Sequence, residues 1–66
     1  MEFEIIFDRE EDGRWIAEIE SLPGVLAYCG TKNEARSRVE ALALRVIADQ
    51  IDANESVPAQ VRFALA

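Results

Sequence analysis

The sequence contains no histidine and a single cysteine, Cys29. Without histidine the commonest general base is missing, and no cysteine–histidine pair can activate a nucleophile or hold zinc. A lone cysteine cannot form an internal disulfide bond. Ser21, Ser37 and Ser56 have no base obviously placed to activate them. We therefore predict that the protein is not an enzyme, and we expect no catalytic residues, no cofactor and no metal.

Long hydrophobic runs are also missing. The longest, at residues 41–44 and 46–48, are far shorter than the roughly 20 residues that a membrane-spanning helix needs. Met1 leads directly into a strand-like pattern rather than into a signal peptide. We therefore expect a cytoplasmic protein that does not bind membranes.

The chain is short, with 66 residues, of which 50% are hydrophobic. This composition is typical of folded proteins, and the length predicts one small domain over residues 1–66. A core of this size rarely gives more than roughly 3–5 kcal/mol of stability. Self-association as a dimer or a larger assembly is therefore expected.

The net charge is −6, and the excess of acid lies in residues 1–20. There, two arginines accompany the acids Glu2, Glu4, Asp8, Glu10, Glu11, Asp12, Glu18 and Glu20. An acidic surface repels nucleic-acid phosphates, so we expect no direct contact with DNA or RNA. The charge fits either plain solubility or a basic protein partner.

Residues 2–10 and 14–20 alternate apolar and charged side chains, as half-buried β-strands do. A loop one residue longer than a tight Asp-Gly turn sets Phe7 opposite Ala17 and keeps charge out of the core. We predict this register for the hairpin, with Gly13 in the left-handed conformation and odd-numbered side chains buried.

The rest of the chain shows a turn, a short strand, a helix and a final strand. Residues 21–24 have turn chemistry, and a strand is predicted over residues 25–29. Thr31 and Glu34 form a capping-box pattern at the start of an amphipathic helix that ends near residues 52–56. The apolar stripe of this helix consists of Ala35, Val39, Leu42, Ala43, Val46, Ile47 and Ile51.

Residues 57–65 alternate again and predict a fourth strand, which Pro58 marks as an edge of the sheet. The predicted fold class is α+β with the order β-β-β-α-β. It consists of an antiparallel three-stranded meander, a crossover helix on one face of the sheet, and a final strand.

The predicted hairpin register leaves acids around two aliphatic side chains on one face. We call this set the outer face: Glu4, Ile6, Asp8, Ile16, Glu18 and Glu20. Either a partner covers Ile6 and Ile16, or they are simply exposed, as a few aliphatic residues are on most proteins. Asp8 and Glu18 also match a two-carboxylate nuclease site for a divalent metal, although acids on the wet face of a hairpin are ordinary.

Cys29 admits two interpretations. The N-terminus of the following helix would favour a reactive thiolate. Alternation, however, places Val25, Ala27 and Cys29 on one face of the strand, where cysteine acts as a small hydrophobic residue. The alternation favours packing.

In this order, the segments resemble the HicB-like antitoxin family. Its pattern has an acidic hairpin ending in glycine, an aromatic residue opening the second strand, a Leu-Pro-Gly turn, a Gly-x-Thr before the helix and a Glu-Glu-Ala at its start. The matching positions are Asp12-Gly13, Trp15, Leu22-Pro23-Gly24, Cys29-Gly30-Thr31 and Asn33-Glu34-Ala35. The resemblance covers nearly the whole chain, residues 3–58.

The resemblance implies a partial ribonuclease H fold without the ribonuclease H carboxylate cluster. It also implies a domain that binds and blocks a small basic ribonuclease toxin, which has a double-stranded-RNA-binding-like fold and a catalytic histidine. We expect the outer face to bind such a toxin. Family members carry a C-terminal DNA-binding segment, which we do not expect here because the chain ends at Ala66. The alternative is an orphan homo-oligomeric domain with no toxin partner.

Cys29 stands where the family usually has glycine. If that glycine has a positive φ, cysteine would cost on the order of 1 kcal/mol there. We predict that the neighbouring Gly30 takes the positive φ instead.

Overall fold

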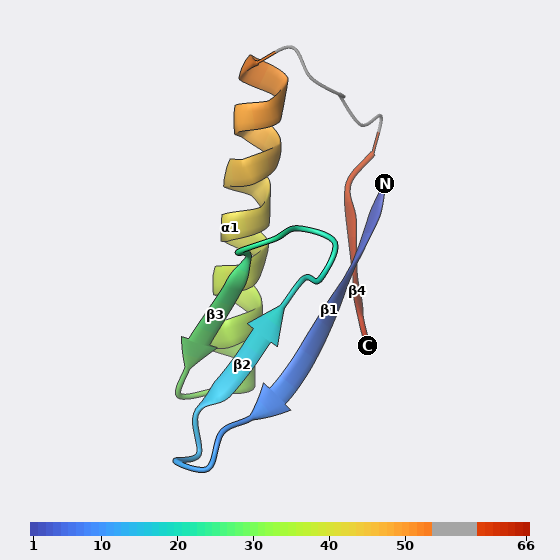
Figure 1. Cartoon of the computed structure of the whole chain (residues 1–66). Coiled ribbons are helices and arrows are strands. Elements are labelled where there is room, and N and C mark those ends of the chain that lie inside the picture. Colours follow the sequence, from blue (N-terminus) through green and yellow to red (C-terminus); the bar gives the residue numbers. More distant parts are fainter. Residues whose placement is uncertain (54–59) are drawn as a thin grey trace.

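The computed structural model describes residues 1–53 and 60–66, which form one sheet and one helix. The elements follow the order β1 (Glu2–Arg9), β2 (Trp15–Glu18), β3 (Leu26–Cys29), α1 (Lys32–Asp52) and β4 (Arg62–Leu65). The strand order in the sheet is β3-β2-β1-β4 (Figure 1). β2 is antiparallel to both β1 and β3, whereas β4 is parallel to β1. The predicted α+β fold with the order β-β-β-α-β is confirmed.

The helix α1 lies on one face of the sheet and packs chiefly against β2 and β3 (Figure 1). The chain leaves β3 at one edge of the sheet, runs through α1 and returns as β4 at the opposite edge. The edge position predicted for the last strand is therefore confirmed. The observed strand is shorter than predicted, and Pro58 lies outside the described residues.

The β1–β2 hairpin has the register that the alternation predicts, with Phe7 opposite Ala17. The backbone N–H of Glu10 donates to the carbonyl of Arg14 at 2.8 Å, and the N–H of Gly13 donates to the carbonyl of Glu10 at 2.9 Å. Gly13 has a φ of 89°, which side chains rarely adopt. The longer loop with a left-handed glycine is thus confirmed.

The connection from β2 to β3 is a second glycine-dependent turn. The N–H of Val25 donates to the carbonyl of Leu22 at 3.0 Å, and Gly24 has a φ of 82°. The N–H of Ile19 donates to the carbonyl of Val25 at 3.1 Å, which continues the pairing beyond the end of β2.

The prediction that Gly30 takes a positive φ is wrong, because among the described residues only Gly13 and Gly24 are positive-φ glycines. Cys29 is the last residue of β3 and pairs with Trp15. Thr31 is also extended, with φ −126° and ψ 156°. The chain therefore passes from strand to helix without a left-handed residue, and cysteine fits the strand end without strain.

Cys29 is buried in the core, as the alternation predicts. The buried residues are Phe3, Ile5, Ala17, Ile19, Leu22, Val25, Ala27, Cys29, Ala35, Val39, Ala43 and Ile47. On both hairpin strands the buried residues are odd-numbered, as predicted. Of the predicted helix stripe, Leu42 and Val46 are only partly buried and Ile51 is exposed. Ile51 lies in the last turn of α1, which extends beyond the sheet (Figure 1).

Thr31 caps the N-terminus of α1. Its Oγ1 accepts a hydrogen bond from the backbone N–H of Glu34 at 3.2 Å, which is half of the predicted capping box. At the other end, the N–H of Ala53 donates to the carbonyl of Asp49 at 3.0 Å. The predicted helix boundaries are confirmed.

Removing this cap is expected to destabilise the protein measurably. Thr31→Ala leaves the N–H of Glu34 without its side-chain acceptor, which typically costs about 1 kcal/mol. Urea unfolding followed by circular dichroism measures the loss. Thr31→Ser keeps the hydroxyl and should retain most of the stability, so equal losses in both variants would contradict a capping role.

Candidate protein-binding surface

The outer face begins where β1 and β2 pair. Ile6 lies opposite Glu18, and Asp8 lies opposite Ile16. Each aliphatic side chain therefore has a carboxylate as its cross-strand neighbour. Ile6 and Ile16 are half-buried, and α1 lies on the opposite face of the sheet, over the odd-numbered core residues (Figure 1). These four predicted residues are brought together as expected.

The other two predicted residues lie at the margin of this face. Glu4 pairs with Ala64 of β4, while Glu20 follows the end of β2, in the turn before β3. The observed β1–β2 pairs stop at Ile6 and Glu18, so Glu4 and Glu20 are not cross-strand partners in this ladder. Both side chains are exposed.

Two further residues belong to the same face and were missed by sequence reasoning. Leu26 pairs with Glu18, and Tyr28 pairs with Ile16, so β3 extends the outer face by one strand. Both are exposed, Leu26 by 39% and Tyr28 by 46%. The signal was present in the alternation, because a strand that buries Ala27 must turn both neighbours to the other side.

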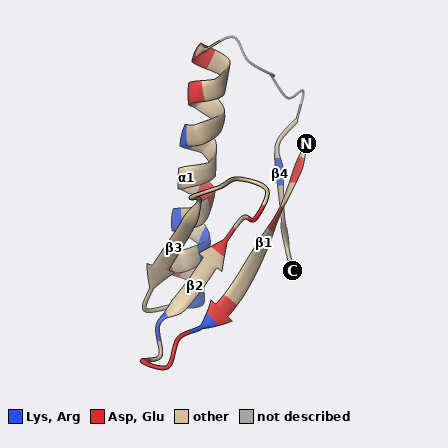
Figure 2. Ribbon diagram, in the orientation of Figure 1, with Lys and Arg blue, Asp and Glu red and all other residues tan. Residues whose placement is uncertain are grey.

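Acidic side chains predominate on β1 and in the loop after it, whereas α1 carries acidic and basic residues in equal number (Figure 2). In the loop, the backbone N–H of Arg14 donates to Oδ1 of Asp12 at 3.0 Å, and its Nε to Oδ2 at 2.7 Å. These bonds, the backbone one above all, hold the pKa of Asp12 below its ordinary value. The carboxylate therefore stays charged to lower pH than usual.

The bases close to the hairpin are engaged with aromatic rings. The guanidinium carbon of Arg14 lies 5.3 Å from the centre of the Tyr28 ring, and that of Arg9 lies 5.4 Å from the centre of the Trp15 ring. These contacts hold the two arginines at the end of the hairpin.

Asp8 and Glu18 are diagonal neighbours across the β1–β2 pair. Among residues 1–53 and 60–66, no group of three or more histidine, cysteine or acidic side chains lies close enough to hold a metal ion. No helix in the described part of the chain is long and apolar enough to cross a membrane.

The chain matches no protein-family model, no curated protein and no solved structure. The resemblance to HicB-like antitoxins rests on the sequence motifs alone.

Proposed function

We propose that the outer face binds a small basic protein, and that the chain acts like the toxin-neutralising domain of a HicB-like type II antitoxin. The observation that carries the proposal is the pairing of each outer-face aliphatic with an acid, Ile6 with Glu18 and Ile16 with Asp8. Carboxylates around an apolar centre are complementary to a basic surface with an apolar patch.

The mechanism is steric. Arginine and lysine side chains of a ribonuclease toxin would meet Asp8, Glu18 and the marginal acids Glu4 and Glu20. Ile6 and Ile16 would supply the contact from which water is excluded. Docking of the sheet would then cover the toxin's active site. The protein itself would act in the cytoplasm, without catalysis, cofactor or metal, and without direct contact to nucleic acid.

Reversal of one outer-face charge tests the proposal. The target would be a small basic ribonuclease whose gene neighbours that of this chain, and the readout would be inhibition of its RNA cleavage by purified protein. Glu18→Lys should weaken inhibition about tenfold or more and lower its sensitivity to salt, because attraction becomes repulsion.

Glu11→Lys is the matched control, since it makes the same charge change at an exposed position of the hairpin loop. Its effect should be small. Equal effects of the two reversals, or a wild-type chain that does not inhibit, would contradict docking through the outer face.

The second candidate is an orphan homo-oligomer that uses the same face. The observation that favours it is the exposure of Leu26 and Tyr28 beside Ile6 and Ile16, which extends the apolar part of the face. Sedimentation equilibrium separates the candidates. A dimer that Ile16→Lys dissociates supports self-association, whereas a stable monomer counts against it.

A further inference from the structure

The edge of the sheet formed by β3 is open. In the described part of the chain β3 pairs only with β2, so backbone groups on its other side are free to pair. The strand Leu26–Cys29 contains no charged residue and no proline, which are common means of protecting an edge. The opposite edge, β4, carries Arg62, which forms an ion pair with Glu2.

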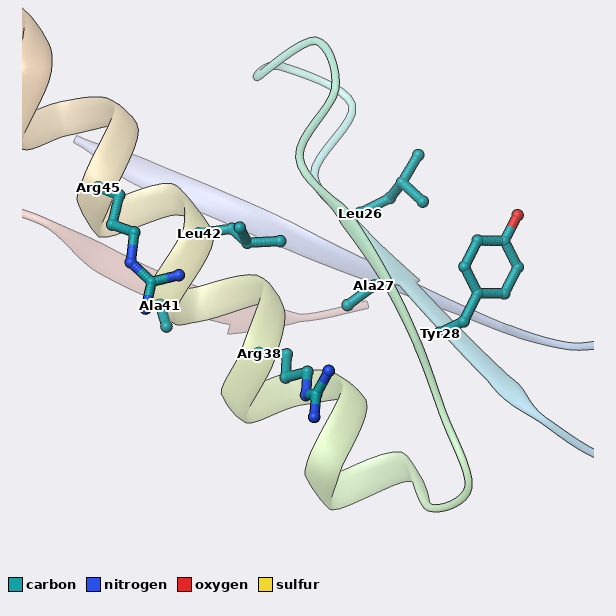
Figure 3. Close-up of a pocket in the computed structure, with 7 residues that line it drawn as sticks. All are labelled: Leu26, Ala27, Tyr28, Arg38, Ala41, Leu42 and Arg45. Atoms are coloured by element: carbon teal, nitrogen blue, oxygen red, sulfur yellow. The ribbon is translucent and has the colours of Figure 1, made fainter.

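A groove of about 430 Å³ runs between this edge and α1. The helix contributes Arg38, Ala41, Leu42 and Arg45. The strand contributes residues from both of its faces, since Ala27 points inward while Leu26 and Tyr28 point away from the helix (Figure 3). Because both faces of β3 line it, the groove follows the edge of the sheet itself.

The groove is basic in a protein whose net charge is −6. Its charged residues are Arg38 and Arg45, with no acid among the residues that line it. Within residues 1–53 and 60–66, these two arginines form no ion pair and no contact with an aromatic ring. Every other basic side chain forms an ion pair or lies against an aromatic ring: Arg9, Arg14, Lys32, Arg36 and Arg62.

The axial spacing of the two arginines lies between the spacings of side chains two and four residues apart on one face of an extended chain. Residues 38 and 45 are two helical turns apart, about 10.5 Å along the axis. Side chains on one face of a strand recur about every 6.7 Å, so two carboxylates two or four residues apart fall within reach of the two long side chains.

We propose that this groove binds an extended acidic segment of a partner protein, which adds to β3 as a further strand and places its carboxylates on Arg38 and Arg45. Strand addition satisfies the free backbone of β3, and arginine binds carboxylates through charge-assisted hydrogen bonds. The side chains that alternate with these carboxylates would lie on the opposite face and pack on Leu26 and Tyr28.

Two other occupants fit the groove less well. A nucleic-acid backbone would meet the two arginines but cannot pair with the peptide groups of β3. A second copy joined edge to edge about a two-fold axis would bring the arginines of both helices together, and like charges repel. The segment would touch the outer face only at Leu26 and Tyr28, and the proposal does not depend on the acids of that face, which would attract basic partners.

A dye-labelled peptide of alternating glutamate and valine tests the proposal by fluorescence anisotropy. Wild-type protein should bind it, and Arg38→Gln and Arg45→Gln should each weaken binding about tenfold. Arg36→Gln is the matched control, because Arg36 lies on the same helix but pairs with Glu40 outside the groove. All three arginines are exposed, so circular dichroism should show an unchanged fold.

Changes in the peptide test the strand pairing. Methylation of alternate backbone nitrogens on the pairing side should abolish binding, and a lysine–valine peptide should not bind. No binding of the acidic peptide at about 1 mM, or an equal loss in Arg36→Gln, would overturn the proposal. A short single-stranded RNA that binds through Arg38 and Arg45 where the peptide does not would also overturn it. So would a wild-type dimer that Arg38→Gln strengthens and that excludes the peptide.

Discussion

Replacement of Ile5 by alanine is expected to remove most of the stability of the fold. Ile5 is fully buried in the middle of the sheet, in a strand paired on both sides. Truncation of a buried isoleucine to alanine costs about 2–5 kcal/mol. A domain of this size rarely has more than roughly 3–5 kcal/mol in total. Urea titration with circular dichroism should therefore show Ile5→Ala largely unfolded before urea is added.

The neighbouring residue provides the control. Ile6→Ala makes the same chemical change on the outer face, where the side chain is only half-buried. Its loss of stability should be well below that of Ile5→Ala. The comparison also tests the strand register, because a slip by one residue would exchange the two faces. Equal losses, or a larger loss for Ile6→Ala, would contradict the observed pairing.

The second large effect is expected at Ala43, which is fully buried on the face of α1 that meets the sheet. Small residues occupy both sides of this contact, with Ala35 on the helix and Ala17 on β2 also fully buried. Ala43→Leu inserts additional carbon atoms where no space is left and should cost about 1–3 kcal/mol or more. The midpoint of urea unfolding measures the effect.

Ala48→Leu is the matched control, because Ala48 lies on the same helix and is exposed. Alanine and leucine have similar helix propensities, so this control should change stability by less than about 0.5 kcal/mol. If Ala43→Leu is as stable as Ala48→Leu, α1 does not approach the sheet closely.

Much of the fold could be predicted because local chemistry decides it. Alternation excludes the register that would bury Glu18 beside Phe7, and the positive φ of Gly13 follows from the loop length that remains. The hydroxyl of Thr31 marks the helix start in the same direct way. The error at Gly30 came from the resemblance rather than from local chemistry.

The candidate surfaces were predictable only in part. The residues at the centre of the outer face follow from the hairpin register. Its extension by Leu26 and Tyr28 follows only when the pairing of β3 with β2 is also worked out. The basic groove could not be found in this way. Arg38 and Arg45 look like ordinary polar positions of a helix until the tertiary structure places them beside an open strand.

The parallel pairing of β4 with β1 has a consequence for synthesis. Arg62 and Glu2 are 60 residues apart in the chain, yet they are register partners, and the N–H of Arg62 donates to the carbonyl of Met1. While the nascent chain is still on the ribosome, β1 has a partner on only one side. Contacts so distant in sequence form slowly. One edge of β1 therefore stays open to wrong partners until β4 has left the exit tunnel and closed it.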